Sequence, residues 1–263
     1  MFQEEFFIMI FTVDVGNTNI VLAVYKNDKI LFSSRIATQH YQTADEYAVL
    51  FMGILNLNNC PADNFEGAII STVVPQLKPV LKSALIKLLK CPVMIVSCNM
   101  KTGFEILTDN PSVTGADLIC GAAGARLKYS YPAIIFDLGT ATTIVAIDHN
   151  GNYLGGSIIP GVNVSLKTLA NSAAQLSHIN LDEPCTEIIG KNTINAMRSG
   201  SIIGTACMMD GMIERYKGII GKDAVVIATG GLSGLIVPHC RNAVIYDKDL
   251  ISEGLYYLYK LNK

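Results

Sequence analysis

The sequence predicts an α/β protein made of two similar halves, each with a mixed β-sheet flanked by helices. One pattern occurs twice, first at 11–25 and again at 135–147: an apolar strand, an Asp-x-Gly turn followed by Asn or Thr, and a second apolar strand. Strands and helices alternate along the rest of the chain, which is typical of sheets covered by helices. The separation of the two copies is too long for a solenoid repeat and fits a duplicated domain, so we expect halves at 1–118 and 119–263.

In the first half, the repeated pattern continues through a polar turn at 26–29 into a third strand, and the three strands form a β-meander. Thr43 precedes an acidic first turn, which is typical of a helix N-terminus. The remaining expected elements are a buried strand at 67–74, an amphipathic helix at 77–89, a strand at 92–97 and a helix rich in small residues that opens at 114–117.

In the second half, a polar turn at 148–151 leads into a matching meander. We expect a long helix from about 193 to 217, then a strand at 224–228 that ends in Thr229-Gly230-Gly231. Spacings of three to four residues, or multiples of this, put three glycines of the long helix on one face, where another backbone can approach closely. The three are Gly200, Gly204 and Gly211. Packing within the subunit and a subunit interface both remain open for this face.

The composition excludes several classes of function. Half of the 263 residues are apolar, 16% are charged and the net charge is −2, so nothing indicates disorder, nucleic-acid binding or an anionic membrane surface. The mean hydropathy of +0.37 without a membrane-length apolar run indicates buried strands and an extensive subunit interface. Acidic residues stand in 1–13 where a signal peptide is basic, so we expect a short extension and a first strand there.

The cysteines and histidines do not indicate a metal site. Seven cysteines and four histidines are scattered along the chain without Cys-x-x-Cys or other zinc-ligand spacing. Free, mostly buried thiols fit the reducing cytoplasm. We therefore expect a soluble cytoplasmic oligomer.

The two Asp-x-Gly turns carry the strongest chemical signal. Glycine permits a tight turn whose backbone amides point outward, and the flanking Asn and Thr side chains add neutral donors, so the turn can hold phosphate oxygens. Asp14 and Asp137 would repel phosphate directly and are suited to act through Mg²⁺, which prefers carboxylate and water oxygens. The Gly230-Gly231 turn lets the backbone pass against a flat ligand such as adenosine. The pattern therefore predicts a nucleoside triphosphate held in a cleft between the halves.

Two phosphate turns and a Gly-Gly turn resemble the sugar kinase, Hsp70 and actin superfamily. Within it, ordered motifs from Val13 onward resemble the type III pantothenate kinase family. The main motifs are Asp14-Val-Gly-Asn-Thr-Asn19, Ile69-Ile-Ser-Thr-Val-Val-Pro75, Gly115-Ala-Asp117, Asp137-Leu-Gly-Thr-Ala-Thr-Thr143, Leu154-Gly-Gly-Ser-Ile-Ile-Pro-Gly161, Gly190-Lys-Asn-Thr-Ile-Asn-Ala-Met197 and Ala228-Thr-Gly-Gly-Leu232.

The resemblance implies two actin-like, ribonuclease H-like domains in a homodimer. It implies that ATP, with Mg²⁺ and K⁺ or NH₄⁺, phosphorylates the primary hydroxyl of pantothenate, the first step toward coenzyme A. It implies Asp14 and Asp117 as catalytic residues, with Asp117 as general base, and Asp14 and Asp137 as metal ligands. The residues implied to bind ATP are Asp14, Gly16, Asn17, Thr18, Asn19, Gly139, Thr140, Thr142, Gly230 and Gly231. Those implied to bind the acceptor are Thr108, Gly115, Asp117, Leu118 and Thr193, the last reaching into the partner subunit's pocket.

Two positions depart from the family pattern, and both belong to the acceptor set. The family has Arg after Gly115-Ala-Asp117 and Tyr seven residues before the motif's glycine; this chain has Leu118 and Thr108. Replacing Arg with Leu removes a charged partner for an acidic substrate, which typically costs about 1.5–3 kcal/mol. Three interpretations follow: a pantothenate kinase with an altered acceptor pocket, a nucleotide-binding homologue that acts through partners, and a kinase for another small hydroxyl compound.

Overall fold

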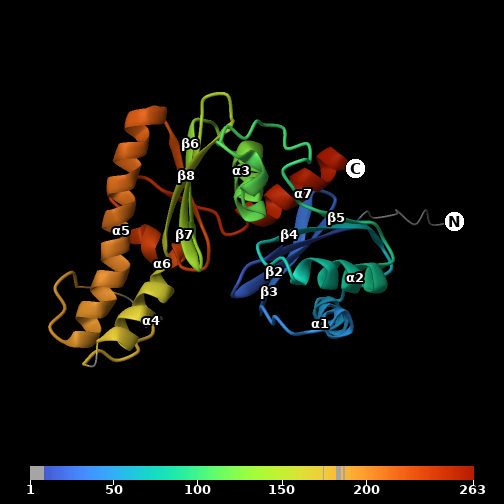
Figure 1. Ribbon diagram of the computed structural model, residues 1–263, viewed down its shortest axis with the longest axis horizontal. Helices are drawn as coiled ribbons and strands as arrows, with labels where there is room; N and C mark the ends of the chain where they lie inside the picture. Colours follow the sequence, from blue (N-terminus) through green and yellow to red (C-terminus); the bar gives the residue numbers. More distant parts are fainter. Residues whose placement is uncertain (1–8, 174, 182–184, 186) are drawn as a thin grey trace. The chain divides into compact units, whose positions relative to one another are not determined.

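The computed structural model describes residues 9–173, 175–181, 185 and 187–263 (Figure 1). The chain forms two compact units that are discontinuous in sequence. The first contains the chain up to Gly103, Asn110–Leu127 and Ile251–Lys263, and the second contains Phe104–Asp109 and Lys128–Leu250. The boundary expected after residue 118 falls inside helix α3 (Ala116–Lys128), nearly all of which packs with the first unit. The extension expected before the first strand lies mostly outside the described residues.

The first unit is built on a five-stranded sheet with strand order β3-β2-β1-β4-β5. Its antiparallel part is the predicted meander; β4 then pairs in parallel with β1, and β5 pairs in parallel with β4. The strands are β1 (Met9–Val15), β2 (Asn19–Lys26), β3 (Lys29–Ala37), β4 (Phe65–Thr72) and β5 (Val93–Ile95).

Helices α1 (Ala44–Leu57) and α2 (Leu77–Leu89) cover one face of this sheet, and Figure 1 shows them on the same side. Helix α1 begins where predicted, because Thr43 and Glu46 form a capping box: each side chain accepts a hydrogen bond from the other's backbone N–H. The core between helices and sheet contains fully buried aromatic and aliphatic side chains, among them Phe11, Val13, Tyr47, Phe51 and Leu81.

Helices α3 and α7 (Leu250–Asn262) pack on the opposite face of the same sheet. Tyr25 of β2 stacks on Tyr256 of α7 with ring centroids 4.2 Å apart, and a side chain on Gly67 of β4 would overlap Tyr259. A Cβ on Gly254 of α7 would overlap the carbonyl oxygen of Cys120 in α3. The small residues of α3 therefore serve close packing of two helices within one unit. Helix α7 was not predicted from the sequence.

The second unit repeats the first in topology. Strands β6 (Ala133–Leu138), β7 (Ala141–Ile147) and β8 (Tyr153–Pro160) form the predicted meander. Strand β9 (Val225–Thr229) pairs in parallel with β6, and β10 (Ile245–Tyr246) pairs in parallel with β9. The order β8-β7-β6-β9-β10 matches β3-β2-β1-β4-β5 strand for strand. The predicted duplication and the mixed sheets flanked by helices are confirmed.

One face of the second sheet is covered by α4 (Val162–Ser172), the long helix α5 (Thr193–Ile220) and the short α6 (Ser233–Ile236). Two 3₁₀ turns, η1 (Pro111–Val113) in the first unit and η2 (Val237–His239) in the second, complete the helical elements. Helix α5 confirms the predicted long helix and continues past its expected end to Ile220. Helices α4 and α6 and strand β10 were not predicted. Over the described residues, no helix combines the length and apolar content that crossing a membrane requires.

Candidate active site

The first Asp-x-Gly turn connects β1 to β2 at the carboxyl end of β1, which is where open α/β sheets bind ligands. The Gly16 N–H donates to the Asn19 carbonyl oxygen at 2.9 Å, which closes the turn. Thr38, just after β3, holds it from the side, because its hydroxyl donates to the Gly16 carbonyl at 2.7 Å. Asn17, Thr18 and Asn19 are exposed, while Asp14 is half-buried.

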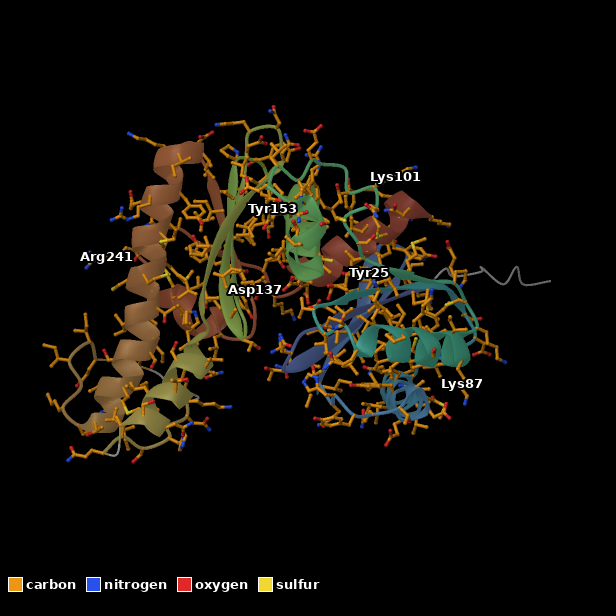
Figure 2. The ribbon with its side chains drawn as sticks, in the orientation of Figure 1. Tyr25, Lys87, Lys101, Asp137, Tyr153 and Arg241 are labelled. Atoms are coloured by element: carbon orange, nitrogen blue, oxygen red, sulfur yellow. The ribbon has the colours of Figure 1, made fainter. Side chains whose placement is uncertain are left out.

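The second turn occupies the equivalent position between β6 and β7. The Gly139 N–H donates to the Ala141 carbonyl at 3.1 Å, and Thr140 is exposed. Asp137, labelled in Figure 2, pairs with Thr143 across the β6–β7 ladder as Asp14 pairs with Val21 across β1–β2. The two aspartates therefore stand at matching positions of the two sheets.

Two glycines from other segments, Gly230 and Gly161, pack directly against the second turn, where there is no room for a side chain. Gly230 follows β9 with φ +94°, and a Cβ there would lie 2.5 Å from the Asp137 Oδ1 atom and 2.7 Å from the Leu138 nitrogen. A Cβ on Gly161, after β8, would overlap the Gly139 and Thr140 carbonyl oxygens. Gly161 belongs to the motif at 154–161 but was not predicted to be a site residue. Its position directly after Pro160, which ends the strand following the turn, could have indicated that it lies next to the turn. Gly231, next to Gly230, is exposed.

Asp117 lies in the first turn of α3 and belongs to the first unit, like Asp14. Its Oδ1 atom accepts a hydrogen bond from the Leu118 N–H at 2.8 Å, so the carboxylate folds back over the start of the helix. A Cβ on Gly115 would lie 2.5 Å from that same oxygen, so a side chain at this position would displace the Asp117 carboxylate from the place it occupies. Burial raises the pKa of the Asp117 carboxyl above its ordinary value, against the opposing effect of the Leu118 N–H.

Asp14 and Asp117 share a neighbour, the fully buried Cys120 one turn along α3. Burial raises the pKa of the Cys120 thiol well above its usual value, and the charges of Asp14 and Asp117 raise it further. Both carboxylates therefore act on one buried thiol, which stays protonated at neutral pH. From the sequence, Cys120 was expected only to be a free cysteine.

Two predicted site residues, Thr142 and Thr108, do not lie with the other residues of their predicted sets. Thr142 is buried, and because side chains alternate along a strand, it faces away from Asp137 and Thr143, toward α4 and α5. Thr108 belongs to the second unit, whereas Gly115, Asp117 and Leu118 belong to the first. The Thr108 hydroxyl is buried without a hydrogen-bond partner among the described residues, and its methyl group faces Gly155.

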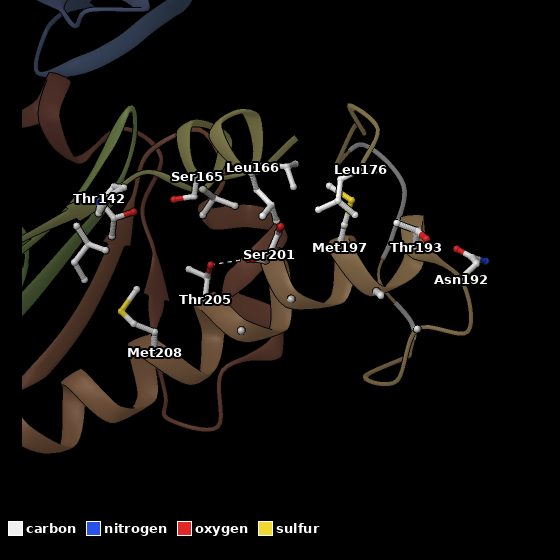
Figure 3. A pocket seen from close by; sticks show the side chains of 18 of the residues that line it. Thr142, Ser165, Leu166, Leu176, Asn192, Thr193, Met197, Ser201, Thr205 and Met208 are labelled. Atoms are coloured by element: carbon white, nitrogen blue, oxygen red, sulfur yellow. Dashed lines mark hydrogen bonds between the residues drawn. The ribbon is translucent and has the colours of Figure 1, made fainter. Parts of the chain in front are cut away.

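Thr193 is the first residue of α5 and lines a cavity of about 810 Å³ in the second unit (Figure 3). Gly190 packs under the start of the helix, and the Asn192 side chain accepts from the Asn195 N–H at 2.9 Å, so the first turn of α5, which carries Thr193, is capped. Helices α4 and α5 form the walls, and the lining is mostly apolar, including Leu166, Leu169, Leu176, Met197 and Met208.

The donor set fits a magnesium ion held jointly with phosphate. The described residues contain no group of three His, Cys, Asp or Glu side chains gathered as for a metal held by protein alone. Mg²⁺ in phosphoryl-transfer enzymes needs no such group, because it keeps several waters and binds through one or two carboxylates and substrate phosphates. Asp14 and Asp137 are each half-buried beside an exposed turn of their own unit, and a carboxylate in such a place is of the kind that this binding mode uses.

A family model and two similar curated relatives all point to the same protein family. The family model described as "Type III pantothenate kinase" matches residues 10–215. A protein of that name from Exiguobacterium sibiricum is 40% identical over 255 residues, covering 97% of this chain and 100% of the relative. Another of that name, from Exiguobacterium sp., is 41% identical over the same length and the same shares of the two chains.

The fold is similar to that of solved sugar kinases. The inorganic polyphosphate/ATP-glucomannokinase from Arthrobacter sp. superposes with a TM-score of 0.50, covering 95% of this chain and 96% of that structure. The sequences of the two are 15% identical, so this likeness concerns the fold alone. It agrees with the two actin-like units that the sequence predicted.

Proposed function

Since the chain belongs to the type III pantothenate kinase family, we propose that it transfers the γ-phosphoryl group of ATP to the primary hydroxyl of pantothenate, giving 4′-phosphopantothenate for coenzyme A synthesis. The observation that carries this proposal is the pair of Asp-x-Gly turns at equivalent strand ends of two duplicated sheets. A single turn of this kind is an ordinary hairpin, whereas two related turns supply donors for a polyphosphate chain.

The proposed mechanism assigns the proton transfer to Asp117. Its carboxylate accepts the proton of the pantothenate hydroxyl, the hydroxyl oxygen forms a bond to the γ-phosphorus, and the bond from that phosphorus to the β–γ bridging oxygen breaks to release ADP. Asn17, Thr18 and Asn19 in one turn, and Thr140 in the other, donate hydrogen bonds to phosphate oxygens. Gly230 and Gly231 leave room for adenosine. The cytoplasm is the proposed location, in keeping with the free thiols.

Asp14 and Asp137 are the residues proposed to hold metal. Mg²⁺, when bound, neutralises charge that develops on the transferred phosphoryl group. A monovalent cation, K⁺ or NH₄⁺, is proposed beside the second turn, with Asp137, Thr140 and Thr142 as its neighbours; because Thr142 faces away from Asp137, we expect any contribution of Thr142 to come from its backbone.

Direct assay tests the proposal. Purified protein with ATP, Mg²⁺ and a K⁺ or NH₄⁺ salt should convert pantothenate to its phosphate, measured by mass spectrometry of the product. ATP binding by calorimetry without product formation would favour instead a nucleotide-binding homologue that acts through partners. Turnover of ATP with another small alcohol, and none with pantothenate, would identify a kinase of different specificity.

The acceptor pocket should respond to restoring the family residues. We expect Leu118→Arg combined with Thr108→Tyr to lower the KM for pantothenate by roughly tenfold to a hundredfold, because a guanidinium gives the substrate carboxylate a charge-assisted partner. The KM for ATP should not change, which makes it the internal control. An unchanged or higher KM for pantothenate would show that these positions do not contact the acceptor.

We propose a homodimer that uses the exposed face of α5. A Cβ on Gly200, Gly204 or Gly211 would meet nothing within 4 Å, so these glycines do not serve packing inside the subunit. The nearby Ile188 and Ile189 are 70% and 77% exposed, which adds apolar surface at the start of the same helix. Thr193 would then reach the acceptor pocket of the partner subunit.

A bulky charge on this face should separate the subunits. We expect Gly204→Arg to convert the dimer to a monomer in sedimentation velocity, because a guanidinium cannot be buried unpaired in a small-residue interface. Thermal unfolding of the monomer at matched concentration checks that the chain stays folded. As the comparison, Gly53→Arg on the exposed face of α1 should leave the dimer intact.

A further inference from the structure

Cys120 lies in α3, one turn after Asp117, and its thiol faces the sheet that carries Asp14. Asp117 and Cys120 are three residues apart in α3 and therefore share a helix face. On the sheet, Asp14 of β1 is the register partner of Ser71 of β4, so these two side chains point to the same face. Ser71 is fully buried, and its hydroxyl faces the Cys120 thiol without another partner among the described residues.

The helix that carries Cys120 is held from its other side by α7. The backbone of α7 at Gly254 approaches the Cys120 carbonyl oxygen and the Gly124 nitrogen so closely that no Cβ fits between them. Helix α3 is thus confined between α7 and the sheet. Because a confined helix cannot move away to accommodate a different side chain, the volume at position 120 sets the distance between α3 and the carboxyl ends of β1 and β4.

We propose that Cys120 is a positioning residue, whose sulfur fills the gap to Ser71 and thereby fixes Asp117 relative to Asp14. The inference rests on the proposed function, in which these two carboxylates act on the same reaction. It also explains why a fully buried, protonated thiol stands one turn from the proposed base: sulfur is larger than a hydroxyl oxygen and fills this gap without introducing a second charge.

Small changes at position 120 provide the test. Cys120→Ala should lower kcat on the order of 10- to 100-fold, as expected when reacting groups are displaced by about 1 Å, while the KM for ATP changes little. Cys60→Ala is the matched control, since Cys60 is a second buried thiol of the same unit that packs on the opposite face of the sheet, near Met9. It should lose stability without losing kcat. Equal kcat values for Cys120→Ala and wild type would overturn the proposal.

An exchange of the two facing residues separates positioning from general stability. Ser71→Cys overfills the gap and Cys120→Ser underfills it, so each should lower kcat, and the double variant should recover most of the loss because the sulfur is restored from the other side. Losses that multiply in the double variant would contradict the inference.

Crystal structures decide the matter even if the wild-type protein proves not to phosphorylate pantothenate. In Cys120→Ala the separation of the Asp14 and Asp117 carboxyl groups should change by more than about 0.5 Å, the tolerance of a working site. An unchanged separation refutes the positioning role. Absence of phosphorylated product from the wild type refutes the proposed function instead, so the two failures are distinguishable.

Discussion

Replacing Asp117 by Asn should abolish most turnover while leaving the protein folded. The amide cannot accept the proton of the acceptor hydroxyl, and a positioned general base typically contributes 10²- to 10⁴-fold, so we expect kcat to fall by roughly that factor. The Asn oxygen can still accept the hydrogen bond from the Leu118 N–H. Binding of Mg²⁺-ATP, measured by calorimetry, should therefore be unchanged. Turnover at the wild-type rate would show that Asp117 is not the base.

The same substitution should raise thermal stability at neutral pH. Because burial raises the folded-state pKa of Asp117, the folded protein binds this proton more tightly than the unfolded chain does. Stability from this group is therefore present below the ordinary carboxyl pKa and is lost as the pH rises through the folded-state value. The amide introduced by Asp117→Asn carries no charge at any pH, so the Tm of this variant should exceed that of wild type at pH 7, and the two should converge in acid.

Activity should increase with pH, whereas the stability contribution of Asp117 decreases. A carboxyl base works only when ionised, so kcat/KM should rise with pH through the pKa of Asp117, which burial raises from its ordinary value. The profile of kcat/KM measured from about pH 4 to about pH 8 gives the midpoint of this limb. A group that supports catalysis thus destabilises the fold at the same pH, which is the expected trade-off for a buried catalytic carboxyl.

The elements that the sequence predicted are those fixed by local signals. The meanders follow from apolar strands separated by polar turns, and α1 follows from the Thr43–Glu46 capping box. Helix α7 had a signal in the helical spacing of the buried Leu255, Leu258 and Tyr259, but Gly254 interrupts the pattern. What that glycine does, admitting the backbone of α3, depends on a segment more than a hundred residues away and cannot be inferred from local sequence.

Which segments make up each of the two units also depends on contacts between distant parts of the chain, so it could not be predicted from local sequence. A duplicated motif suggests that the chain divides once, near its middle. Instead, α3 and α7 both pack on the first sheet, so the first unit takes its last helix from the end of the chain. Among the site residues, the exposed turn positions were readable from Asp-x-Gly, whereas the orientation of Thr142 depends on the register of β6 with β7. The role of Cys120 required knowing which strand lies beneath α3.

Gly230→Ala should produce a large loss of both stability and nucleotide affinity. A φ of +94° is strained for any residue with a Cβ, which costs about 1–2 kcal/mol, and the contacts with Asp137 and Leu138 add about 1–3 kcal/mol of overpacking. We expect the Tm to fall by roughly 5–15 °C. Because the new methyl group displaces the Asp137 carboxyl, the Kd for Mg²⁺-ATP should rise at least about tenfold.

The matched control is a glycine where an added Cβ would contact no other atoms. Gly53 lies in α1, where a Cβ would meet nothing within 4 Å, so Gly53→Ala should stabilise the protein by about 0.5–1 kcal/mol through helix propensity and leave ATP binding unchanged. Thermal unfolding and calorimetry of the two variants separate the cost of a methyl group in general from its cost beside Asp137. Wild-type ATP affinity in Gly230→Ala would mean that the second turn does not bind the nucleotide, and the symmetrical role of the two turns would have to be abandoned.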